Sequence, residues 1–244
     1  LRDVVSKRRA KDASNTTLAK TFQGGSLSIA GANSAASLAS RSIRLLLLDE
    51  IDRYPSALKG EGSPIAIALK RTTTYGRRRR VGMFSSPTIE GAPIHSWYLR
   101  GDQRKYYVPC ASCGHLHTFK WKNVRWNSKT NDPTTARIHC PKCDYGMDDG
   151  ERVVVLDPKR GAEWRATEPG RRDKRIASLH LWEAYSPLSS LTDIVAGFIA
   201  AREKQKAGDD HEMHTWENTT LGEPVAPDTG DGVEPHMLIA RREH

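Results

Sequence analysis

Apolar residues in the first hundred positions alternate between strand-like and helix-like spacing. The apolar, unalternating run at 43–48 predicts a strand buried on both faces, as in a parallel sheet. Short strands are also predicted at 26–30 and 81–84, and a small-residue helix at 35–39. Residues 64–74 follow a Ser-Pro pair, which favours a helix start, and repeat apolar residues on one helical face. This alternation of strand and helix predicts an α/β fold with a parallel sheet.

The later part of the chain has a different pattern. Aromatic residues and all four cysteines gather in 106–150. Residues 176–182 alternate like a strand, and 191–206 repeat apolar residues at helical spacing. Residues 222–235 are rich in Gly and Pro and are typical of a linker. No stretch approaches the ~20 apolar residues of a membrane helix, and we see no apolar signal-peptide region, so we expect no membrane partner.

The length and the charge of the chain limit the classes of function that fit it. The 244 residues are enough for one large domain or one domain with a small module. Lys and Arg number 38 against 29 Asp and Glu, a net charge of +9. Such an excess favours a polyanionic partner, with nucleic acid as the leading candidate. A basic protein without such a partner is the alternative.

The four cysteines form two CxxC pairs, Cys110 with Cys113 and Cys140 with Cys143. A CxxC turn places two thiolates on one side of a tight knuckle, and two knuckles complete a tetrahedron. In a chain without a signal peptide this spacing indicates a Zn²⁺ site. A redox pair and a ribbon that has lost its metal are the alternatives.

Residues beside the two pairs have expected roles of their own. Gly114 follows the first pair and Gly146 lies just past the second, where glycine eases the backbone turn. Because four thiolates already fill the coordination shell, we expect the neighbouring His115, His117 and His139 to be bystanders.

Acidic residues follow the apolar run at 43–48. An apolar strand that ends in Asp49-Glu50 resembles the second nucleotide-binding motif of P-loop ATPases, in which Asp49 would hold Mg²⁺ and Glu50 would activate the attacking water. A solvated acidic loop is the alternative. Ser85, Ser86 and Thr88, after the next strand, resemble the coupling motif of superfamily 2 helicases and packaging motors, whose hydroxyls sense the γ-phosphate of ATP.

The whole series of motifs resembles one family. Its order is similar to that of the large terminase subunit of tailed bacteriophages, of the lambda-like GpA family. The matching segments are residues 31–34, 47–55, 84–88, 107–115, 120–126, 184–187 and 216–224.

This resemblance implies an ATPase that uses ATP and Mg²⁺ to drive double-stranded DNA into a procapsid in the cytoplasm of the infected bacterial host. The implied partners are the small terminase subunit, the portal of the procapsid and further copies of the same chain. The implied fold is a partial RecA-like (ASCE) P-loop sheet with an inserted zinc-ribbon-like module. The expected domains are a partial ATPase core at 1–105, the zinc module at 106–150, the rest of the ATPase region at 151–221 and a linker toward a nuclease domain at 222–244.

Two departures from the family pattern affect these expectations. No phosphate-binding loop of the form GxxxxGK[ST] occurs, since Gly24-Gly25 lacks the following Lys and hydroxyl. We therefore expect that loop to lie upstream, and this chain alone not to hydrolyse ATP. The family's nuclease domain is expected after the linker, so DNA cleavage is not assigned to these residues.

Two other functions remain open at this point. Residues 49–52 also fit the DExD box of a superfamily 2 helicase or translocase, although such a protein needs a second RecA-like lobe. A non-catalytic zinc-ribbon module that binds DNA is the other alternative.

A basic run precedes the strand at 81–84. In a parallel sheet, Arg77, Arg78, Arg79 and Arg80 emerge at the edge opposite Glu50, where nucleotide does not bind. We therefore expect them to contact DNA or an adjoining subunit; a solvated basic loop is the alternative.

Overall fold

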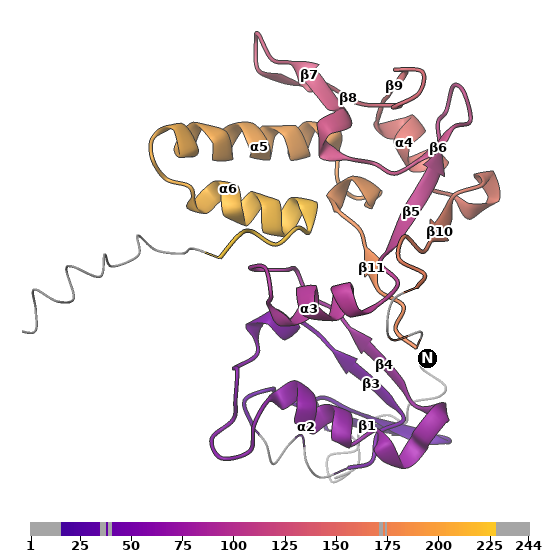
Figure 1. The fold of residues 1–244 in the computed structure, drawn as a ribbon, viewed down its shortest axis with the longest axis vertical. Helices are drawn as coiled ribbons and strands as arrows, with labels where there is room; N and C mark the ends of the chain where they lie inside the picture. Colours follow the sequence, from indigo (N-terminus) through magenta and orange to yellow (C-terminus); the bar gives the residue numbers. More distant parts are fainter. Residues whose placement is uncertain (1–15, 35–37, 39–40, 171–172, 174, 228–244) are drawn as a thin grey trace, which may run out of the picture. The chain divides into compact units, whose positions relative to one another are not determined.

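The computed structural model describes residues 16–34, 38, 41–170, 173 and 175–227 (Figure 1). The chain forms two compact units, residues 1–85 and 86–244. Residues 86–105, which the sequence grouped with the ATPase core, therefore lie in the second unit. Most of the helix expected at 35–39 and the end of the linker at 222–244 fall outside the described residues.

The first unit contains two small sheets. Strands β1 (Ala19–Phe22) and β2 (Gly25–Ser28) form an antiparallel hairpin. Strands β3 (Leu45–Leu48) and β4 (Arg80–Met83) pair in parallel, with Leu45 opposite Arg80 and Leu48 opposite Met83. The crossover between β3 and β4 holds helix α2 and two 3₁₀ segments: η1 (Ile51–Arg53), α2 (Pro64–Lys70) and η2 (Thr73–Arg78).

Strand β3 confirms the position of the predicted strand but corrects its burial. Leu46 and Leu48 are buried, whereas Leu45 and Leu47 are each 61% exposed. Within the described residues β3 pairs only with β4 and is contacted by α2. The sheet is therefore covered on one face, because apolar composition alone does not supply a second covering layer.

The second unit combines antiparallel and parallel pairing. Strand β5 is flanked by an antiparallel β10 and a parallel β11, and β6 pairs with the end of β5. A separate antiparallel sheet has the order β7-β8-β9. The predicted strand at 176–182 shortens to β11. The bounds are β5 (Arg104–Pro109), β6 (Leu116–His117), β7 (Val124–Asn127), β8 (Asp132–His139), β9 (Gly146–Met147), β10 (Glu163–Arg165) and β11 (Leu179–His180).

Helix α5 (Leu191–Lys206) has the predicted bounds, and α6 (His211–Trp216) returns beside it (Figure 1). The Ser190 hydroxyl caps α5 by accepting a hydrogen bond from the Asp193 N–H. No helix among the described residues is long and apolar enough to cross a membrane. The remaining helical segments are α3 (Pro93–Arg100), η3 (Trp121–Asn123), α4 (Asp149–Val155), η4 (Pro158–Arg160), η5 (Glu183–Tyr185) and a π-helical turn η6 (Glu217–Leu221).

One aromatic core joins the cysteine segment to these helices. The Trp121 ring lies 4.9 Å from the Phe198 ring and 4.8 Å from the Trp216 ring, centroid to centroid. The Trp182 indole N–H donates to the Phe119 carbonyl. Tyr106, Phe119, Trp121 and Trp126 therefore belong to a core shared with α5 and α6, which is larger than the small ribbon core expected from the sequence.

A buried arginine ties the same parts together. Arg152 of α4 is 1% exposed and forms an ion pair with Asp149 at 2.9 Å. Its guanidinium also donates to the carbonyls of Ala184, Ser186 and Ser189. Asp149 in turn accepts from the Leu191 N–H at the start of α5. One charged pair thus fixes the turn that leads from the cysteine segment into α5.

We predict that Arg152→Ala lowers the free energy of unfolding of the second unit by about 3–5 kcal/mol, because it removes the ion pair with Asp149 and leaves the carbonyls of Ala184, Ser186 and Ser189 without this donor. Urea unfolding followed by tryptophan fluorescence, with zinc present, measures the change. The control is Arg160→Ala on the exposed η4 turn, expected to change stability by less than about 0.5 kcal/mol. A loss for Arg152→Ala no larger than that of the control would contradict this role.

Candidate functional site

Two acidic residues lie where β3 ends. Asp49 follows Leu48 directly and Glu50 comes next, and both are exposed. Neither carboxylate forms an ion pair with another described residue. Since β3 and β4 are parallel, this is the carboxyl edge of the sheet, the edge at which open α/β sheets bind their ligands. Two accessible carboxylates provide the oxygen ligands that Mg²⁺ prefers.

Glu50 has an unusual backbone conformation. Its φ of 54° and ψ of 46° are left-handed, which costs a non-glycine residue on the order of 1–2 kcal/mol. The next residues hold it there: Ile51 is fully buried, and its N–H donates to the Phe84 carbonyl at 3.3 Å. Backbone strain at an exposed acidic residue is a feature of functional sites, and the sequence gives no signal for it.

The hydroxyl-rich segment after β4 reaches the same turn. The Asp52 N–H donates to the Ser85 Oγ at 3.2 Å, and the Phe84 N–H donates to the Leu48 carbonyl at 2.9 Å. Ser85 is thus joined to the acidic turn, as its predicted role requires. Ser86 and Thr88 belong to the second unit, where the Thr88 carbonyl accepts from the Val225 N–H.

Tyr54 is a neighbour of this site that sequence analysis missed. Burial raises the pKa of Tyr54, the Asp49 backbone amide lowers it, and the Asp49 carboxylate raises it. The phenol therefore lies close enough to Asp49 to feel its charge. Only the spacing Asp49-x₄-Tyr54 across the η1 turn was available as a signal.

The arginine run lies at the other end of these strands. Arg80 opens β4 opposite Leu45, the first residue of β3, whereas Glu50 follows the last. The guanidinium groups of Arg77–Arg80 are exposed and form no ion pair within the described part of the chain. Arg79 and Arg80 donate to Thr72 and to the carbonyls of Arg77 and Arg79. The expected separation of this run from Glu50 is confirmed.

The four cysteine sulfur atoms lie together in the second unit. All are within 4.8 Å of one another, with 3.7 Å between Cys110 and Cys143 and 3.8 Å between Cys113 and Cys140. A zinc tetrahedron with Zn–S bonds of about 2.3 Å has S···S edges of about 3.8 Å. The donor set and spacing therefore fit a tetrahedral metal ion.

Each cysteine pair lies at the turn of a hairpin, and the two turns have the same hydrogen bonds. The Cys110 N–H donates to the His115 carbonyl at 3.0 Å, and the Cys140 N–H donates to the Tyr145 carbonyl at 3.0 Å. The residue after each second cysteine is left-handed: Gly114 at φ 69° and Asp144 at φ 60°. The expectation for Gly146 is thus corrected, since Asp144 makes the turn, held by an ion pair with Arg125 at 2.8 Å.

The thiols influence one another strongly. The His115 N–H, followed by the neighbouring cysteines, lowers the pKa of Cys113 to about 7. The Tyr145 N–H lowers the pKa of Cys143, but the hydrogen bond with Cys113 and burial outweigh it and raise that pKa to about 12. Burial raises the pKa of Cys110. Four thiols this close cannot all ionise without a cation among them, which favours a metal.

Comparison with known proteins identifies the family. A family model described as phage terminase large subunit gpA, ATPase domain, matches residues 1–164, about two thirds of the chain. The chain belongs to the phage terminase large subunit gpA family. A second model, terminase large subunit gpA, endonuclease domain, matches residues 176–244. This nuclease model begins before the residues 222–244 that sequence analysis treated as a linker.

Relatives of this gpA-family chain are found in lambda-like phages. The terminase large subunit of Enterobacteria phage P21 is 24% identical over 94% of the chain, and that of Escherichia phage lambda is 22% identical over 96%. The chain spans 38% of the length of either relative. No solved structure matches it.

We predict that this gpA-family chain, purified without chelator, carries about one zinc ion, and that Cys140→Ser removes it. Because the cysteine segment shares its aromatic core with α5 and α6, the loss is expected to change the tryptophan fluorescence of the whole second unit and lower its melting temperature. Metal analysis and thermal unfolding measure both effects. Ser112→Ala, in the first knuckle but without a ligand, is expected to keep the metal; zinc-free wild-type protein would refute the site.

Proposed function

We propose that this chain provides the Walker B and coupling part of an ATP-driven motor that packages viral DNA into procapsids. The observation that carries the proposal is the strained, exposed Glu50 beside Asp49 at the carboxyl end of a parallel strand, with Ser85 of the next strand bonded to the same turn. Membership of the gpA family supports it, since the matching model is an ATPase domain. The fold that this proposal implies for the ATPase part is a P-loop sheet of RecA-like (ASCE) type.

In this proposal the carboxylates have separate tasks. Asp49 holds Mg²⁺, which when bound offsets phosphate charge, and Glu50 accepts the proton of the water that attacks the γ-phosphate. The left-handed backbone of Glu50 keeps its carboxylate at the strand end, because buried Ile51 anchors the residue that follows.

The hydroxyl groups after β4 act in coupling. Ser85, Ser86 and Thr88 sense the γ-phosphate, and the bond between the Asp52 N–H and the Ser85 Oγ links their movement to the acidic turn.

The wider assembly is part of the same proposal. Double-stranded DNA is the substrate, and the small terminase subunit, the portal of the procapsid and further copies of the chain are the partners, in the cytoplasm of the infected bacterium. Residues 1–105 contribute to the ATPase core and 106–150 form the zinc module, whereas the residues from 176 on lead into the nuclease domain, since the nuclease model begins there. The gpA family match weighs against the helicase and the non-catalytic module as alternatives.

We predict that Glu50→Gln, in a terminase large subunit of the relatives' full length that contains these residues, leaves ATP affinity within about twofold and lowers kcat at least ~100-fold, since it removes only the general base. A steady-state phosphate-release assay and nucleotide binding measure the two quantities. Glu61→Gln, in an exposed loop of the same unit, is the matched control.

A second variant separates chemistry from folding. Glu50→Gly also removes the base but relieves the left-handed strain, so turnover is expected to fall while the free energy of unfolding stays equal or rises by about 1 kcal/mol. Normal hydrolysis by either variant would show that Glu50 is not the base.

We further propose that Arg77–Arg80 contact the phosphates of DNA. Replacing all four with Ala is expected to weaken DNA binding without sequence preference and to flatten the salt dependence of the affinity by about one slope unit per lost contact. Basal ATPase without DNA is expected to persist, because the run lies at the opposite strand end from Glu50. Unchanged affinity and slope would contradict the DNA role, and loss of basal ATPase would contradict the geometric separation.

A further inference from the structure

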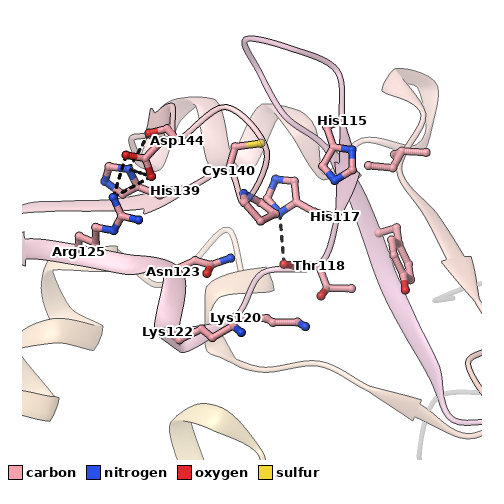
Figure 2. A pocket seen from close by; sticks show the side chains of 13 residues that line it. His115, His117, Thr118, Lys120, Lys122, Asn123, Arg125, His139, Cys140 and Asp144 are labelled. Carbon is pink, nitrogen blue, oxygen red and sulfur yellow. Dashed lines mark hydrogen bonds and ion pairs between the residues drawn. The ribbon is translucent and has the colours of Figure 1, made fainter.

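A polar cavity of about 470 Å³ opens beside the metal-binding cysteines (Figure 2). Its wall includes Cys140 of the second knuckle, together with Arg125 and Asp144 that hold the turn after Cys143, and two lysines that neither the metal site nor the ATPase site uses. Tyr107 and Asn123 also line the cavity, beside Lys120, Lys122, Arg125 and Asp144.

Two lysines of the cavity flank a tryptophan that packs into the aromatic core. Lys120, Trp121 and Lys122 are consecutive residues at the η3 turn. The Trp121 indole packs into the aromatic core against Phe198 and Trp216, while both flanking lysines line the cavity. A partly buried tryptophan packed on the aromatic core therefore holds the backbone of the two exposed lysines beside the cavity.

The positive charge of Lys120 and Lys122 is not neutralised by other residues of the cavity wall. Asp144 is the one carboxylate in its wall, and Arg125 already pairs with it at 2.8 Å. Figure 2 shows Arg125, His139 and Asp144 gathered in one group, with Lys120 and Lys122 outside it. Neither lysine forms an ion pair with any described residue.

The pKa of a neighbouring lysine, Lys105, reflects the charges around this cavity. Burial lowers the pKa of Lys105, Glu223 raises it, and the charge of Lys120 lowers it further. The two lysines without ion-pair partners, beside a single carboxylate that is already paired with Arg125, are what favour a negative ligand in this cavity. Tyr107 adds an aromatic wall and Asn123 an amide, groups that suit the sugar and phosphate of a nucleotide strand.

We propose that this cavity is a docking site for the phosphodiester backbone of DNA, with Lys120 and Lys122 as its phosphate ligands. The choice of DNA as the polyanion rests on the proposed packaging function and on the net charge of +9. The contacts are independent of sequence, because the lysines meet phosphates and not base edges. This assigns a DNA-binding role to the side of the zinc module that its metal and core leave exposed.

A rival role for the lysines is internal. Zn²⁺ with four thiolates has a net negative charge, and Cys140 borders the cavity, so Lys120 and Lys122 would in that case serve only to balance the metal centre. The two roles make opposite predictions for zinc affinity and DNA affinity.

The test is the double variant Lys120→Ala/Lys122→Ala of this chain, titrated with a short DNA duplex between about 50 and 200 mM salt. We expect about tenfold weaker binding and a salt slope flatter by about two, with zinc content unchanged. Lys120→Arg/Lys122→Arg, which keeps both charges, is expected to restore the wild-type slope. Lys129→Ala, exposed near the tip of the β7–β8 hairpin, is the matched control.

Each outcome decides the proposal. Wild-type affinity and slope in the double variant would overturn it, and loss of zinc with unchanged DNA binding would assign the lysines to the metal centre. Failure of the arginine pair to restore binding would likewise overturn a purely electrostatic contact. The outcome of this test does not depend on the outcome of the Glu50→Gln test. Normal turnover of the Glu50→Gln variant would refute the ATPase assignment but would leave the result for the cavity unchanged.

Discussion

The close approach of four cysteine sulfur atoms is the constraint on which the second unit depends. It brings together two hairpin turns that are far apart in sequence, at Cys110 and Cys140, with matching hydrogen bonds. Four thiols at this distance are not stable as four thiolates by themselves, so the arrangement of the two hairpins favours a metal ion among them. Because the strands leading from both hairpins enter the aromatic core, the site also orients the surfaces on which α5 and α6 pack.

The core and the buried ion pair extend that constraint beyond the cysteine segment. Trp121 packs against Phe198 and Trp216, and Arg152 bonds the carbonyls of the turn before α5. The segment at 106–150 is therefore continuous with the residues after it. The ATPase model matches the chain up to residue 164 and the nuclease model matches it from residue 176 on.

The first unit depends on different interactions from the second. Its acidic turn is an exposed feature held by backbone bonds, from Ile51 to Phe84 and from Asp52 to Ser85. The left-handed Glu50 is tolerated because the neighbouring Ile51 is locked in the core. The proposed ATPase role needs a carboxylate that is placed accurately yet open to water and phosphate, and a strained residue beside a buried one meets both requirements.

The sequence by itself determined the local and strongly spaced features. The CxxC pairs, the apolar strand ending in Asp49-Glu50 and the bounds of α5 follow from patterns within a few residues, where turn geometry and helical period leave little choice. The tertiary structure alone decided the one-sided burial of β3, the left-handed backbones of Glu50 and Asp144, and the joining of the cysteine segment to α5 and α6. It also placed Lys120 and Lys122 on one cavity. These features depend on contacts between residues distant in sequence, whose energies no local pattern contains.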